Sequence, residues 1–376
     1  MPVTIQHNVA NDKDAGIFEV GYQILHKTGI CFVGENDNTG KPFHHGGKEQ
    51  NTCTINTFCT PTTMTDHSLH KELLFPRYWP TWCGFGFMWL IARLPFPMQM
   101  GMGNLLGRLM MLFKRRRQIC QINIALAFPE LGPEKQAKLV KDVFISVGKG
   151  LVETSIAWFA TDKKIHQLVD IIGIEHLEQA RKSSKGIILL GSHFVPIEVC
   201  GRRLGQEYPF VTTYKPTRNA LFEYVMHHRR RRIYGGAIPV SDARKIMKIL
   251  KSGETIWHAP DQNYGRKNSV FVPFFNIDTL TTTWTSRMAK TGNAIVVPTF
   301  TLRNPRDDGY TLHILPGLEG YPSESAEQDA ARIMSLIEEW ARKYPDQYLW
   351  THRRFKDHPE GGKNRYERYL ESGKFH

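Results

Sequence analysis

Hydrophobic residues follow two patterns along the chain: short unbroken runs, and longer segments with helical spacing. Residues 186–190, Gly-Ile-Ile-Leu-Leu, are the clearest short run, and they predict a strand buried on both faces in the middle of a parallel sheet. Further strands are predicted at residues 210–214, 254–258, 294–300 and 310–315. Helical spacing occurs at residues 132–159, 175–182, 219–232, 242–250, 283–290 and 327–343. The alternation predicts an α/β fold, with a mostly parallel central sheet flanked by helices.

A third pattern precedes these elements. Residues 79–92 carry no charge, contain three tryptophans and are flanked by Arg77 and Arg93. A bilayer span needs about 20 apolar residues, so a segment of this length is more typical of an interfacial or core helix, and the sequence leaves open whether it spans the membrane. Residues 98–113 are mostly apolar, with Arg108 as their one charge, and a basic cluster at residues 114–117 follows them. We therefore predict an N-terminal hydrophobic membrane-associated helix, transmembrane or interfacial. The alternative is a helix pair that covers the sheet.

Composition divides the chain into three parts. Residues 1–63 are rich in Asn, Thr, Gly and His, and hold four lysines, six acidic residues and no arginine. This segment sustains no hydrophobic period and is expected to be a disordered extension. We assign residues 64–117 to a membrane-associated helical region and residues 118–376 to an α/β domain.

The net charge of +13 indicates anionic partners, such as an acidic membrane surface, an acidic protein or nucleic acid. The six cysteines show no CxxC pair and no metal-ligand spacing. We interpret them as reduced thiols in a cytoplasmic setting.

The strongest candidate for chemistry lies just beyond the central run. His193 follows the predicted strand by two residues, and Glu198 falls in the first turn of the helix that begins near Pro196. Five residues of ideal helix turn through about 500°, so the two side chains meet only if His193 folds back from the turn. Glu198 would then hold one ring nitrogen while the other acts as a general base. Alternatively, the histidine only hydrogen-bonds a helix terminus and Glu198 is ordinary first-turn charge.

Other polar residues are expected near the same sheet edge. Lys215, a candidate substrate-binding residue, follows the strand at 210–214. Asp261 follows the strand at 254–258, either as a turn residue or as a ligand contact. The helix at 219–232 ends in four consecutive arginines, of which Arg229, Arg230 and Arg232 are our candidates for binding phosphate. A solvated helix end is the simpler alternative.

With these residues identified, the chain from about residue 64 to 366 resembles the late lipid A biosynthesis acyltransferases, the lauroyl/myristoyl transferase family of Gram-negative bacteria. Its most specific motifs are Arg-Tyr-Trp at 77–79 and Trp-x-His-Arg-Arg-Phe-Lys at 350–356. Further matching motifs, in order, are Leu94-Pro95, Asn123, residues 128–130, 150–153, 157–159, 214–216, 259–261 and 269–275.

The resemblance implies an enzyme on the cytoplasmic face of the bacterial inner membrane. Such an enzyme transfers a fatty acyl chain from acyl carrier protein to a hydroxyacyl chain of the phosphorylated, Kdo-bearing lipid A precursor. His193 and Glu198 would be catalytic, and Arg230 and Asp261 align with functional residues of the family. No cofactor and no nucleic acid partner are expected. The motifs as a whole favour the lauroyl branch over the myristoyl branch.

Two positions depart from the family pattern. Arg229-Arg230 stands where the family usually has Gly-Arg, which leaves open which guanidinium has the family role. Lys215 stands where relatives often carry arginine.

Three other functions remain as alternatives. The His-x4-acid motif is shared with glycerolipid acyltransferases, which act on acceptors such as lysophosphatidic acid. The basic surface also suits a non-catalytic binder of anionic lipid or nucleic acid. A metal hydrolase using His193, His258 and Asp261 is the weakest alternative, because no third ligand has convincing spacing.

Overall fold

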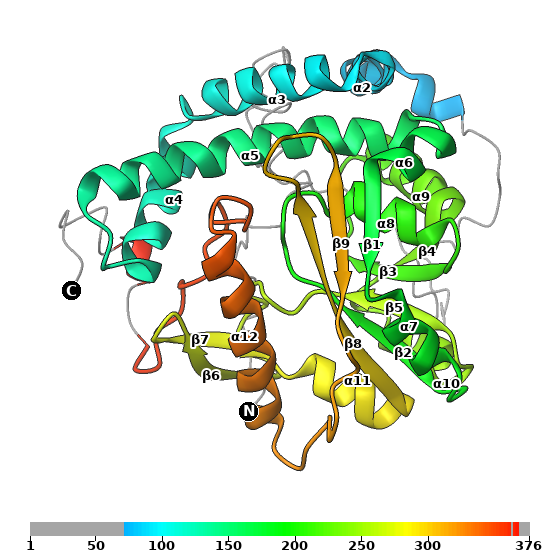
Figure 1. The fold of residues 1–376 in the computed structure, drawn as a ribbon, viewed down its shortest axis with the longest axis vertical. Coiled ribbons are helices and arrows are strands. Elements are labelled where there is room, and N and C mark those ends of the chain that lie inside the picture. Colours follow the sequence, from blue (N-terminus) through cyan, green and yellow to red (C-terminus); the bar gives the residue numbers. More distant parts are fainter. Residues whose placement is uncertain (1–70, 362–363, 368–376) are drawn as a thin grey trace, which may run out of the picture.

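A mixed seven-stranded sheet forms the centre of the computed structural model, which describes residues 71–361 and 364–367. In chain order its strands are β1 (Val169–Ile172), β2 (Gly186–Leu190), β3 (Phe210–Tyr214), β4 (Gly235–Pro239), β5 (Thr255–His258), β8 (Ala294–Arg303) and β9 (Tyr310–Ile314). Their spatial order is β1-β9-β8-β2-β5-β3-β4 (Figure 1). Every neighbouring pair is parallel except β8 with β9. The predicted mostly parallel sheet is confirmed; the predicted extension at residues 1–63 lies outside the described residues.

Strand β2 is buried over its whole length, as its composition predicts. Ile187 and Leu189 belong to one core cluster, which α8 (Ile197–Gly205) and α9 (Ala220–Tyr234) complete. Ile188 and Leu190 belong to the other, to which α10 (Ala243–Lys251), α11 (Trp284–Gly292) and α12 (Ala326–Lys343) contribute. The strand is apolar at every position because helices cover both faces of the sheet.

Helix α5 (Pro133–Phe159) connects the two core clusters and confirms the helix predicted at residues 132–159. Residues 139–147 pack in one cluster and residues 152–158 in the other. The short helices α6 (Asp162–Leu168) and α7 (Ile174–Arg181) flank β1 and carry the chain from α5 to β2.

Several elements were not predicted because their local signals are weak. Strand β4 begins with two glycines and ends with a proline, and it is held by parallel pairing with β3. The hairpin of β6 (Ser269–Phe274) and β7 (Ile277–Thr282) forms a separate two-stranded sheet, and β6 contains a proline. Such strands depend on their partners rather than on their own propensity.

Helices α2 (Trp79–Arg93) and α3 (Phe96–Met110) lie on the side of α5 away from the sheet (Figure 1). Helix α3 runs along α5, whereas α2 is seen nearly end-on. Helix α4 (Lys114–Ala127) follows, so the predicted boundary at residue 117 falls inside it. Within the described ranges, no helix has the length and apolar content needed to cross a bilayer, so the transmembrane alternative for residues 79–92 is not supported.

Large hydrophobic side chains are exposed mainly on this helical region. Of the twelve that are exposed in the described part of the chain, ten fall between Leu74 and Leu112. On α3 the outward residues include Leu105 and Leu109, which are 57% and 49% exposed. We call these ten residues the apolar surface; they are Leu74, Phe75, Trp79, Phe87, Trp89, Leu90, Met98, Leu105, Leu109 and Leu112.

Glycines allow α3 and α5 to pack backbone against backbone. A Cβ on Gly148 of α5 would lie 2.2 Å from the backbone nitrogen of Gly107 and 2.4 Å from the carbonyl oxygen of Gly103, both on α3. Gly103 and Gly107 are one helical turn apart and face α5, whereas Leu105 and Leu109 lie about 200° around the helix. Because the glycine face of α3 packs against α5, Leu105 and Leu109 on its opposite face are exposed to solvent.

We predict that Gly148→Ala destabilises the protein by about 1–3 kcal/mol, because the added methyl group meets backbone that cannot move aside. Denaturant unfolding in detergent measures the effect. Gly101→Ala on α3 is the matched control, since a Cβ there meets nothing within 4 Å. Equal stability of the two variants would contradict this account of the packing.

Candidate active site

His193 lies in the loop between β2 and α8 and is held by Asp261, which follows β5. Asp261 Oδ1 lies 2.6 Å from His193 Nδ1, and Oδ2 accepts a 2.7 Å hydrogen bond from the backbone N–H of His193. Strand β5 is the direct neighbour of β2, with Leu190 opposite His258. The carboxyl ends of the two parallel strands therefore bring the histidine and the carboxylate together.

The surroundings of the pair favour an ionised Asp261 and a defined imidazole tautomer. Burial alone would raise the pKa of Asp261, but the charge of His193 and its two hydrogen bonds, together with Arg354, lower it below the ordinary value. A carboxylate facing Nδ1 places the ring proton on that nitrogen, which leaves Nε2 with its lone pair free. The His193 side chain is 18% exposed and that of Asp261 is fully buried. The arrangement suits a general base at Nε2.

The C-terminal segment fixes the loop that carries His193. The backbone N–H of Leu349 donates to the carbonyl of His193 at 3.1 Å, and that of Val195 donates to Gln347 at 2.9 Å. Asn123 of α4 in turn donates to the carbonyls of Trp350 and His352 at 2.6 and 2.7 Å. Residues 347–349 thus hold the loop of His193, and Asn123 anchors the motif at 350–356 that follows them.

Glu198 occupies a different place from the one predicted for it. Its carboxylate forms a buried ion pair with Arg230, accepts from the Tyr234 hydroxyl at 2.5 Å and accepts from the Trp158 indole at 3.1 Å. The prediction that Glu198 holds the imidazole of His193 is wrong in this structure, because Asp261 does so. Glu198 lies inside α8 and faces α5 and α9, whereas His193 precedes the helix and faces β5.

The Glu198–Arg230 pair is a buried structural contact. Glu198 is 5% exposed and Arg230 is 6% exposed. Burial alone would lower the pKa of Arg230, but Glu198 and Tyr234 more than offset this and raise it. Burial and Glu198 likewise raise the pKa of Tyr234 well above its usual range. A pair this enclosed is strongly destabilising when only one partner is removed.

The other predicted binding residues are dispersed. Lys215 is exposed just beyond β3, and no contact to His193 or Asp261 is found for it within the described ranges. Arg229 and Arg232 line a cavity bounded in part by the second half of α8, away from the loop of His193. The four arginines therefore do not act as one group beside His193.

His258 does not form a metal site with His193 and Asp261. It is buried beside Thr213, with 3.1 Å between Nδ1 and Oγ1, and burial is the main cause that lowers its pKa to about 4. Within the part of the chain that the structure describes, no group of three or more His, Cys, Asp or Glu residues could hold a metal ion.

Three further residues near His193 were not singled out as site residues from the sequence. Tyr348, His352 and Arg354 line the narrow pocket that also contains His193 and Asp261. Burial, followed by the charges of His193 and Arg354, lowers the pKa of His352 to about 3, so it is a neutral group there. Arg354 is buried and donates to the carbonyl of Leu280 at 2.7 Å. The motif at 350–356, which contains His352 and Arg354, was the available signal. It identified the family but did not show that these side chains lie beside His193.

We predict that Glu198→Gln lowers the free energy of unfolding by roughly 3–5 kcal/mol, because it leaves the guanidinium of Arg230 buried without its carboxylate. Glu198→Gln combined with Arg230→Met should cost less than the sum of the single variants, as a double-mutant cycle in denaturant measures.

Glu339→Gln is the matched control for this cycle. Its partner Lys343 lies 2.7 Å away, but both side chains are more than half exposed, at 57% and 56%. Exposed pairs of this kind contribute about 0.3–0.5 kcal/mol. If Glu198→Gln were no more destabilising than Glu339→Gln, the structural role of Glu198 would have to be abandoned.

The sequence of the chain is similar to that of known proteins over most of its length. The family model "Bacterial lipid A biosynthesis acyltransferase" matches residues 67–357. The chain is 40% identical to the lipid A biosynthesis lauroyltransferase of Escherichia coli over 78% of this chain and 97% of that protein. It is 38% identical to the palmitoleoyltransferase of the same organism (79% and 97%) and 26% identical to its myristoyltransferase (79% and 93%). The predicted resemblance is confirmed: the chain belongs to the bacterial lipid A biosynthesis acyltransferase family, and it is an acyltransferase.

Proposed function

We propose that the protein transfers a fatty acyl chain from acyl carrier protein to the hydroxyl of a hydroxyacyl chain on the Kdo-bearing, phosphorylated lipid A precursor. The observation that carries this proposal is the buried Asp261 bound to Nδ1 of His193, 2.6 Å away, at the end of the central strand. Membership of the lipid A acyltransferase family supports the choice of acceptor.

His193 acts as the general base in this proposal. Its Nε2 removes the proton from the acceptor hydroxyl, and the oxygen attacks the thioester carbonyl directly. The carbon–oxygen bond of the new ester forms as the carbon–sulfur bond breaks, and the imidazolium returns the proton to the leaving thiolate. Asp261 is the positioning residue, because it holds the ring and balances the imidazolium charge. Backbone amides or a basic side chain stabilise the oxyanion, and no cofactor is required.

Laurate is the proposed acyl group. The chain is 40% identical to the lauroyl relative and 38% identical to the palmitoleoyl relative, but only 26% identical to the myristoyl relative. Since the first two identities are nearly equal, palmitoleate is the donor to test beside laurate.

The proposed location is the cytoplasmic face of the bacterial inner membrane. The apolar surface on α2 and α3 supports this, because exposed hydrophobic side chains at this density are typical of membrane or protein contacts. Exposed Lys114 and Arg115 follow it in the chain and are suited to anionic headgroups. Lys215, exposed beyond β3, remains a proposed contact for an anionic substrate.

Mass spectrometry tests the reaction with the full chain in detergent. Lauroyl-, palmitoleoyl- and myristoyl-loaded carrier proteins serve as donors, and the tetra-acylated Kdo-bearing precursor serves as acceptor. We expect one added acyl chain with laurate as the preferred donor. His193→Ala and Asp261→Asn should each lower kcat by about 10²–10⁴-fold, the usual contribution of a positioned general base.

His176→Ala, which removes a histidine on α7 away from the site, is the control for these variants. Transfer to lysophosphatidic acid instead of the precursor would favour a glycerolipid acyltransferase. Full activity of His193→Ala would rule out the mechanism.

Vesicle flotation tests the membrane contact. We expect Leu105→Asp/Leu109→Asp to weaken binding to phosphatidylethanolamine/phosphatidylglycerol vesicles at least about tenfold, since two half-exposed leucines bury on the order of 2 kcal/mol of apolar free energy. Ile172→Asp is the control, because Ile172 is 55% exposed but lies on β1. Unchanged flotation of the double variant would exclude this surface.

A further inference from the structure

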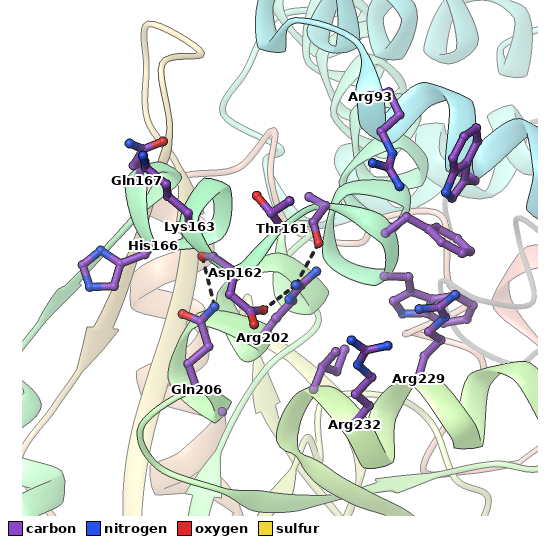
Figure 2. A pocket seen from close by; sticks show the side chains of 16 residues that line it. Arg93, Thr161, Asp162, Lys163, His166, Gln167, Arg202, Gln206, Arg229 and Arg232 are labelled. Atoms are coloured by element: carbon purple, nitrogen blue, oxygen red, sulfur yellow. Dashed lines mark hydrogen bonds and ion pairs between the residues drawn. The ribbon is translucent and has the colours of Figure 1, made fainter. Parts of the chain in front are cut away.

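A large cavity lies apart from the loop of His193. It has a volume of about 1110 Å³ and is bounded by α2, the end of α5, α6, the second half of α8 and α9 (Figure 2). Trp158 lines it and also donates to Glu198, so the buried Glu198–Arg230 pair lies behind its wall. The proposed chemistry at His193 does not account for this space.

Basic side chains dominate the lining. Arg93 from α2 and Arg232 from α9 extend toward each other from opposite sides, with Arg229 beside them (Figure 2). Lys163 lines another part of the wall. Among the described residues, no carboxylate forms an ion pair with any of these four cations.

Asp162, the only acidic residue among the described residues of the lining, is already paired with an arginine. Asp162 lies 2.6 Å from Arg202, and this contact is the main cause that lowers the pKa of Asp162. Arg202 also donates to the carbonyls of Ala157 and Ala160, at 2.7 and 2.9 Å, which fixes the end of α5. The cavity therefore keeps an excess of positive charge.

The arginines are held close to one another in spite of repulsion. Arg229 is half-buried, with its guanidinium 4.4 Å from the centre of the Phe159 ring. Burial first, and then the charges of Arg232 and Arg202, lower the pKa of Arg229. An anion bound between Arg93, Arg229 and Arg232 would relieve this repulsion and accept several charge-assisted hydrogen bonds.

The rim of the cavity joins the apolar surface. Trp89 lines the cavity, is 45% exposed and stacks with Arg93 at 4.6 Å from its ring centre. Its neighbour Leu90 is 57% exposed. A ligand that enters here meets cations inside and apolar side chains outside, which suits the phosphorylated headgroup of a lipid whose chains remain in the membrane.

We propose that this cavity binds a phosphate group of the lipid acceptor, with Arg93, Arg229 and Arg232 as its principal ligands. The inference rests on the proposed function, which supplies an acceptor that is both phosphorylated and membrane-bound.

The position of the cavity limits the acceptor. His193 precedes α8, whereas Arg202 and Gly205, near the end of that helix, line the cavity. At 1.5 Å of rise per residue, the two places are separated by roughly 10 Å along α8. An acceptor must therefore present its hydroxyl well away from its phosphate. A sugar-based lipid with hydroxyacyl chains does so, whereas a glycerol phosphate carries the two groups close together.

Steady-state kinetics on Arg229→Gln/Arg232→Gln tests the proposal. We expect the KM for the bisphosphorylated precursor to rise at least about tenfold, with kcat and the KM for the acylated carrier protein little changed, because the lost contacts bind phosphate and not the reacting atoms. With a precursor from which the phosphates have been removed, the variant and the unaltered enzyme should have equal KM values.

Arg231→Gln is the matched control. Arg231 is exposed on the same helix and carries the same charge, but it does not line the cavity. An equal effect of Arg231→Gln would indicate general surface charge rather than this site. A rise confined to the KM of the carrier protein would assign the cavity to the donor and overturn the proposal.

A binding measurement separates this proposal from the proposed reaction. The His193→Ala enzyme is titrated calorimetrically with bisphosphorylated and dephosphorylated precursor in detergent micelles. We expect tighter binding of the phosphorylated form and loss of that difference in Arg229→Gln/Arg232→Gln. Equal binding of both forms would overturn the phosphate site even if acyl transfer occurs, whereas a phosphate-dependent difference without acyl transfer in the unaltered enzyme would overturn only the reaction.

Discussion

The hydrogen bonds between Asp261 and His193 join the two parts of the molecule on which the proposed chemistry depends. Asp261 binds the ring and the backbone of the histidine at once, at 2.6 and 2.7 Å. A buried carboxylate is costly unless it is fully hydrogen-bonded, so the loop after β2 and the segment after β5 are held in one arrangement. The C-terminal segment adds a third support, since Leu349 donates to the carbonyl of His193.

Two buried ion pairs hold the helices around this site. Glu198 and Arg230 join α8 to α9, and Glu153 of α5 binds Arg303 of β8 at 2.6 Å. Arg303 also donates to the hydroxyl of Ser146, about two turns before Glu153 in α5. Charges this deeply buried are tolerated only when each is paired, so the pairs specify how the helices are placed against the sheet and do not act as mobile catalytic groups.

Helices α2 and α3, outside the core, carry the apolar surface of the molecule. Backbone contact through Gly103, Gly107 and Gly148 holds α3 against α5, and the remaining faces of α2 and α3 are left apolar and exposed. The basic cavity opens next to Trp89 on that surface. The apolar face and the cationic cavity are therefore neighbours, whereas the histidine lies apart from the cavity, at the end of the central strand.

Much of this protein is determined by local pattern in its sequence. The apolar run at 186–190 requires cover on both faces, and the long helical period at 132–159 can be satisfied only by a helix, so β2, α5 and the α/β class follow from the sequence. The His193 position at a strand end and the family motifs are likewise local. Strand β4 and the hairpin of β6 and β7 were not predictable, because their glycines and prolines disfavour strands, and these strands form only through pairing with their partners.

The sequence predicted that Asp261 lies near the same sheet edge as His193, but not that Asp261 rather than Glu198 binds the ring. Glu198 is five residues away in sequence but faces α5 and α9, whereas Asp261, 68 residues away, is brought beside the ring by the parallel pairing of β2 with β5. The tertiary structure also divides the arginine run: Arg230 is paired with the buried Glu198, whereas Arg229 and Arg232 line the cavity. Helical rotation separates neighbours in sequence, and only the packing of α9 determines what each one faces.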